Sequence, residues 1–131
     1  MLSKVLKSLP YTVHTNRELG LLLSGQKPFS AFVDAQGRYP EVVLRYLRLF
    51  DRHVRSGVII RRDHIERLDP QSPYQLHRIM FALPGEEWRF EAYLELWDSK
   101  EWGKAEERAQ GELLGYEDWM NDHWISLKYS D

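Results

Sequence analysis

The five histidines are the side chains of this sequence best suited to acid–base catalysis or metal binding. They lie at positions 14, 53, 64, 77 and 123. None stands in a His-Glu-x-x-His or His-x-His arrangement, in which two imidazoles can reach one ion. Asp122 and His123 are adjacent, and adjacent helical residues point about 100° apart, so this pair is a poor chelate. We therefore expect no metal site and regard the histidines as structural or exposed.

His123 has two interpretations. It shares one face of a predicted C-terminal helix with Trp119 and Trp124. A buried imidazole there needs a hydrogen-bond partner. It either bonds a backbone carbonyl in the core, or acts as a general base or ligand contact in an aromatic pocket between a sheet and this helix. Tyr116, Trp119 and His123 would line that pocket.

Motifs for nucleophilic or phosphate chemistry are absent from the sequence. The chain has no cysteine, which excludes a thiolate nucleophile, a disulfide framework, a zinc finger and an iron–sulfur site. No serine stands in a Gly-x-Ser-x-Gly elbow. The run Ser24-Gly25-Gln26-Lys27 lacks the first glycine and the following hydroxyl residue of a phosphate-binding loop. We expect no catalytic residues and no cofactor, and a binding protein rather than an enzyme.

Four arginines mark the strongest helical pattern, over residues 40–56. One face carries the apolar residues Val43, Leu47, Phe50 and Val54, and the opposite face carries Arg45, Arg48, Arg52 and Arg55. Arginine grips phosphates and carboxylates through a bidentate fork, so Arg48 and Arg52 are candidates for holding an anionic ligand. Glu41–Arg45 and Asp51–Arg55 have i,i+4 spacing, which is typical of a solvated face. The arginine face is therefore solvated or contacts a protein or an acidic ligand.

Charge is divided unevenly along the chain. The net charge is −2, but residues 1–65 carry 11 basic and 5 acidic side chains, whereas residues 66–131 carry 7 and 15. Such asymmetry can mark an interaction surface, or the two halves can pair across the fold. The negative total argues against a dedicated nucleic-acid binder.

All five tryptophans lie in the acidic half, and residues 88–97 alternate in polarity. Trp88 faces the same way as Phe90 and Leu94, which predicts core positions on a strand. The other side carries Glu91, Tyr93, Glu95 and Trp97. If that side is open, its aromatics ringed by charge form a binding patch, and if helices cover it, they are core. A helix over residues 86–98 is the competing interpretation, which the alternation disfavours.

The remaining elements follow from turn and capping residues. A short helix is predicted over Leu2–Ser8, and a second from a Thr15 cap to Gly25. Strands are predicted over Phe29–Asp34 and from Val58 to Arg62, with a possible extension to Leu68. Residues 74–83 and 88–97 form a hairpin, and helices follow after Asp98, with Glu101 in capping-box spacing, and over residues 116–127.

These elements predict a single α+β domain over residues 1–131, with a mainly antiparallel sheet of four or five strands and helices packed on one face. No apolar run approaches the roughly 20 residues of a membrane span, and we expect a cytoplasmic protein. The sequence favours a protein that acts by binding a basic protein partner, such as an inhibitor or immunity-type protein. A small-molecule binder or enzyme is the alternative. The partner's identity and the oligomeric state do not follow from the sequence.

Overall fold

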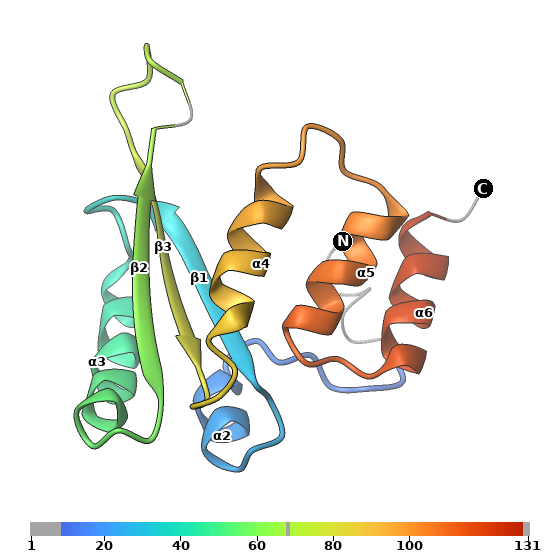
Figure 1. Cartoon of the computed structure of the whole chain (residues 1–131), viewed down its shortest axis with the longest axis horizontal. Coiled ribbons are helices and arrows are strands. Elements are labelled where there is room, and N and C mark those ends of the chain that lie inside the picture. The colour runs from blue at the N-terminus through green and yellow to red at the C-terminus, as the bar shows by residue number, and fades with distance from the viewer. Residues whose placement is uncertain (1–8, 68, 130–131) are drawn as a thin grey trace.

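The computed structural model describes residues 9–67 and 69–129, so the helix predicted over residues 2–8 lies outside the described part. Figure 1 shows the strands of a sheet flanked and followed by helices. Their bounds are α2 Glu18–Leu23, β1 Phe29–Ala35, α3 Glu41–Arg55, β2 Ile60–Glu66, β3 Leu76–Ala82, α4 Trp88–Trp97, α5 Lys104–Leu113 and α6 Asp118–Lys128.

The strands form one antiparallel sheet in the order β1-β3-β2. The central strand β3 pairs Phe81 with Ser30 of β1 and with Arg61 of β2. The α+β class and the antiparallel pairing are thus confirmed. The prediction of four or five strands is wrong, because the described residues contain three strands and residues 88–97 are helical.

Helix α4 replaces the predicted second arm of the hairpin. The residues Phe90, Tyr93 and Trp97 are spaced three and four apart, which places them on one side of a helix, whereas the predicted strand had Phe90 on one face and Tyr93 with Trp97 on the other. Helix-forming glutamate, alanine and leucine fill the rest of the segment. Trp88, predicted as core, is 58% exposed, and Tyr93 is only 6% exposed.

Helices cover both faces of the sheet, so the prediction of helices on one face is wrong. In β3, Ile79 and Phe81 point toward α3, whereas Met80 and Ala82 point toward α4. The continuous apolar run over residues 79–82 of β3 is the sequence signature of a strand segment buried on both faces. Figure 1 shows the sheet between α3 and α4, with α5 and α6 beyond α4.

Two helix starts differ from their predicted positions, while α3 is confirmed. Helix α2 begins at Glu18 rather than after Thr15, because Asn16 adopts a left-handed backbone conformation with φ of 67°. Helix α5 begins after Gly103, whose N–H donates to the Glu106 side chain at 2.8 Å. The Asp98 start predicted for this helix is therefore wrong. No described helix is long and apolar enough to cross a membrane.

Candidate functional site

A groove of about 370 Å³ runs between α4 and α5, and we call it the α4–α5 groove. Apolar residues from both helices line it: Ala92, Leu96, Ala109 and Leu113. Trp88, Glu95 and Glu112 also line it and are exposed. It therefore combines an apolar surface with an exposed indole and two carboxylates.

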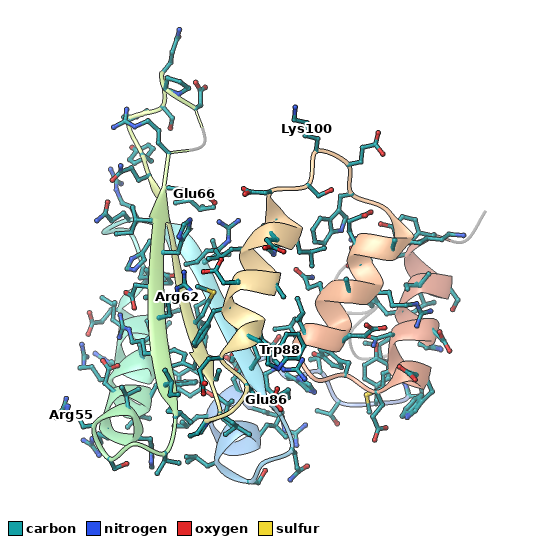
Figure 2. All side chains as sticks on the ribbon, viewed as in Figure 1. Arg55, Arg62, Glu66, Glu86, Trp88 and Lys100 are labelled. Atoms are coloured by element: carbon teal, nitrogen blue, oxygen red, sulfur yellow. The ribbon has the colours of Figure 1, made fainter. Side chains whose placement is uncertain are left out.

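Arg89 is the one basic residue that lines the α4–α5 groove, and its charge is already engaged. Its guanidinium donates to Glu86 at 2.9 Å and to the carbonyls of Glu112 and Leu113 at 3.1 Å each. These carbonyls end α5, so the cation also faces the negative end of that helix dipole. The guanidinium lies 4.5 Å from the Trp88 ring centre, and the Trp88 indole N–H donates to Glu86. Figure 2 shows Trp88 and Glu86 at the lower end of α4.

Glu95 and Glu112 make no ion pair with any residue that the structure describes, and both are exposed. The three C-terminal helices and their loops carry further exposed carboxylates: Glu87, Glu91, Asp98, Glu101, Glu117, Asp118 and Asp122. Of these, Glu91 and Asp122 pair with Arg62 and Arg108. The α4–α5 groove thus belongs to a part of the chain that is rich in exposed carboxylates.

The remaining predicted residues of α4 have other surroundings. Glu91 pairs with Arg62 of β2, so it ties α4 to the sheet. Tyr93 is buried against Phe29, with ring centres 5.1 Å apart. The Trp97 ring stacks on Trp102 at 4.4 Å. Tyr93 and Trp97 therefore do not form the exposed aromatic patch that an open strand face would have given.

Arg48 and Arg52 lie on the exposed side of α3, across the sheet from α4–α6 (Figure 1). Arg48 donates to Glu41 at 3.1 Å, and Arg45 lies 3.6 Å from the same carboxylate, as its i,i+4 spacing predicts. Asp51 instead pairs with Arg61 of β2 at 2.9 Å, which leaves Arg55 without that predicted partner. The α3 arginines cannot share a pocket with residues of α6.

Tyr116, Trp119 and His123 do come together, around Tyr11 of the N-terminal segment. The Tyr11 ring centre lies 6.0 Å from that of Tyr116, 5.4 Å from that of Trp119 and 6.3 Å from that of His123. A cavity of about 220 Å³ opens beside this cluster and is lined by Tyr11, Tyr116 and Trp124, but not by Trp119 or His123. The N-terminal segment, and not the sheet, closes the predicted pocket.

Glu107 lines the same cavity and is a buried carboxylate, 8% exposed. It accepts hydrogen bonds from the indoles of Trp102 and Trp124, at 2.5 and 3.0 Å, and from Lys128 at 3.0 Å. Burial by itself raises the pKa of this carboxyl group, but the three donors outweigh it and leave the pKa lowered. Glu107 is thus a charged anchor between α5 and α6.

Lys27 is a second buried charge that sequence reasoning missed, and its side chain is 1% exposed. Its Nζ lies 2.8 Å from His14 Nδ1 and also donates to the Leu114 carbonyl. Burial lowers the pKa of Lys27 to about 7. Burial, with the nearby charges of Lys27 and Arg17, lowers the pKa of His14 to about 4. No spacing in the sequence signals this pair, because thirteen residues separate its members.

Comparisons with known proteins identify no relative: no family model, no curated protein and no solved structure matches this chain. Among the residues that the structure describes, no cluster of three or more histidine, aspartate or glutamate side chains could hold a metal ion. The candidate sites therefore stand on their geometry alone.

Proposed function

We propose that the protein acts in the cytoplasm by binding a basic protein partner through the α4–α5 groove, without catalysing a reaction. The observation that carries this proposal is the pair Glu95 and Glu112, two exposed carboxylates without ion-pair partners in the described chain, on either side of an apolar groove. An inhibitor or immunity-type protein that blocks a basic protein is one concrete form of this function.

The groove suits a lysine or arginine side chain of the partner. The aliphatic stem of such a residue can lie along Ala92, Leu96 and Ala109, while its charged end reaches Glu95 or Glu112. Trp88 adds a large exposed aromatic surface of the kind that anchors protein interfaces. The surrounding carboxylates accelerate the encounter with a positively charged protein.

A small-molecule-binding protein is the second candidate. The cavity beside Tyr11, Tyr116 and Trp124 supports it, since it is mostly apolar and contains the carboxylate of Glu107 and the amide of Asn121. Glu107 is already fully engaged by its three donors, and this favours a structural role for it over a free polar contact.

The test is a charge reversal confined to the groove. Glu95→Lys with Glu112→Lys is compared with Asp98→Lys and Glu101→Lys, which make the same change of charge in the loop between α4 and α5. A partner is first captured from the native host with the unmodified protein, and its association with all three proteins is then followed by stopped flow at low and high salt.

We expect the groove variant to associate about ten-fold or more slowly at low salt, with the difference shrinking at high salt. The loop variant should stay within about three-fold of the unmodified protein, because its charges lie outside the groove. Equal losses in both variants would reduce the effect to overall charge and contradict the groove assignment. A captured partner without a basic surface would contradict the proposed function.

A further inference from the structure

The His14–Lys27 pair belongs to an unusual electrostatic site. A buried ammonium group normally pairs with a carboxylate, since desolvation of an unpaired charge is costly. Lys27 instead has the neutral acceptors His14 Nδ1 and the Leu114 carbonyl, with the Tyr116 ring centre 5.7 Å from its Nζ. No described carboxylate lies within ion-pair distance of it.

Three contacts fix the orientation of the His14 side chain. Its backbone N–H donates to the Tyr116 hydroxyl at 2.8 Å, and its ring stacks on the Tyr116 ring at 3.7 Å with an interplanar angle of 6°. The Lys27 ammonium can only donate, so when it is charged Nδ1 accepts from it and the proton of the neutral ring lies on Nε2. The Leu114 carbonyl near the ring favours its protonated form, and the positive charge of Lys27 on the Nδ1 side polarises the Nε2–H donor.

A cavity of about 420 Å³ lies beside this donor and is lined by His14, Arg17, Gln26, Glu117, Leu21 and Met120, among others. Arg17 is exposed, and its guanidinium makes no ion pair or side-chain hydrogen bond with a described residue. The cavity therefore gathers an imidazole N–H, a free guanidinium and, behind the imidazole, a buried ammonium.

We propose that this cavity binds the anionic group of a small ligand, a carboxylate or a phosphate, between Arg17 and the Nε2–H of His14. Lys27 has no carboxylate partner, and the anion would supply the missing negative charge nearby. The His14 ring would bridge the two groups, with Nδ1 bonded to the Lys27 ammonium and Nε2–H bonded to the anion. Arginine and histidine N–H groups form charge-assisted hydrogen bonds to either anion. Leu21 and Met120 offer apolar surface to the rest of the ligand.

The other charges near the site limit what it can bind. Glu117 also lines the cavity, although its carboxylate accepts from the Trp119 indole at 2.6 Å. Glu18 attracts the Lys27 charge and Arg89 repels it, but both are bonded elsewhere, to Tyr46 and Glu86. A carboxylate on the cavity wall disfavours polyanions, so the site suits a ligand with a single anionic group.

The test uses sodium acetate and sodium phosphate as separate probes, with sodium chloride of matched ionic strength as the reference. The readout is the NMR signal of the His14 ring nitrogens, identified by its loss in His14→Gln. We expect a saturable shift of Nε2 with acetate, phosphate or both, and none with chloride. A response to one probe alone identifies the anionic group that the site prefers.

Two arginine variants decide the assignment. Arg17→Gln should weaken the probe's binding about ten-fold or more, because it removes a charged donor. Arg55→Gln, a change of an exposed arginine on α3, should leave binding unchanged. Because Arg17 is exposed, its variant should fold normally, whereas a variant of buried Lys27 could fail to fold. A shift that does not saturate, that chloride reproduces, or that survives Arg17→Gln at full strength overturns the proposal.

Discussion

The residues buried on the two faces of the sheet differ in polarity. On the α3 side, the buried residues are apolar apart from Ser30 and cluster around Phe50, whose ring lies 4.4 Å from Phe81 and 4.9 Å from Tyr46. On the α4–α6 side, an apolar cluster around Met80 and Phe90 is joined by the buried polar residues Glu107 and Asn121.

The two sides also differ in how their charged side chains are paired. On the α3 side, Arg61 bridges Asp51 and Asp63, and Asp63 also contacts His77 at 2.8 Å. The hydrogen bond from Arg61 lowers the pKa of Asp63, so this network is charged at neutral pH and binds α3 to the sheet. The other side also has ion pairs, such as Arg62 with Glu91 and Lys128 with Glu107, but there Glu95 and Glu112 stay unpaired among the described residues beside an open groove.

We infer from this contrast that the two sides of the sheet have different roles. An apolar cluster closed by ion pairs stabilises the fold, while helices joined through polar contacts leave grooves and cavities that can bind other molecules. The α4–α5 groove and the His14 cavity both involve α5, α6 or the loop between them.

The largest loss of stability is expected in the α3 core. Phe50→Ala should lower the free energy of unfolding by about 3–5 kcal/mol, because it empties a fully buried aromatic position. Leu49→Ala, next to it but on the exposed side of α3, should cost well under half as much. Urea denaturation of both variants measures the difference. A loss below about 1 kcal/mol for Phe50→Ala would mean that α3 does not face the sheet as described.

The α5–α6 contact is the counterpart on the other side. A Cβ atom at Gly111 would lie 2.0 Å from the amide oxygen of buried Asn121, so Gly111→Ala must displace the Asn121 side chain or separate the two helices. We expect a loss of about 1–3 kcal/mol, as for an overpacked core. Gly20→Ala is the control in α2, where the new methyl group meets open space, and it should stabilise the protein by about 0.5–1 kcal/mol. Equal stability changes in the two variants would show that α5 and α6 are not tightly packed.

Local patterns predicted part of this fold correctly. Helix α3 has an apolar face at helical spacing, with Pro40 before it and Gly57 after it at a φ of 79°. Such signals lie within a few residues of one another, and tertiary contacts did not override them. The prediction for the segment 88–97 was wrong because its polarity alternates as on a strand, while the residues at 90, 93 and 97 also have helical spacing, and burial of Phe90 and Tyr93 against the sheet favoured the helix.

The candidate sites were harder to predict, because they depend on contacts between distant segments. The cluster of Tyr116, Trp119 and His123 was predicted from helical spacing within α6. Its partner Tyr11 lies about a hundred residues away in the chain and carries no such signal. Lys27 looked like an ordinary polar residue of a loop, and only the fold places His14 and the Leu114 carbonyl beside it.

The pH dependence of stability tests this buried lysine. Because the pKa of Lys27 falls from 10.5 to about 7 on folding, the unfolded chain binds the extra proton between these values. The free energy of unfolding should therefore rise with pH above about 7, with a slope of at most about 1.4 kcal/mol per pH unit from this group. His14, with a pKa of about 4 when folded and 6.5 when unfolded, adds a similar rise between those values.

Denaturation of the unmodified protein and of Lys27→Met between about pH 6 and 10 measures this slope. Lys27→Met should remove most of the rise above pH 7, and Lys128→Met, a change of a more exposed lysine, should leave it in place. If the unmodified protein shows no rise, the Lys27 ammonium is not destabilised by burial, and the contrast between an apolar and a polar side of the sheet weakens.

The smallest effect is expected at the ion pair between Arg62 and Glu91, which joins β2 to α4. Both side chains are largely exposed, so water and salt screen their attraction. A double-mutant cycle of Arg62→Gln and Glu91→Gln should give a coupling free energy of about 0.2–1 kcal/mol, lower at high salt.

Glu95→Gln is the matched control on the same helix, and its coupling to Arg62→Gln should be close to zero. A coupling well above 1 kcal/mol would mean that charge, and not the apolar cluster around Met80, holds α4 on the sheet.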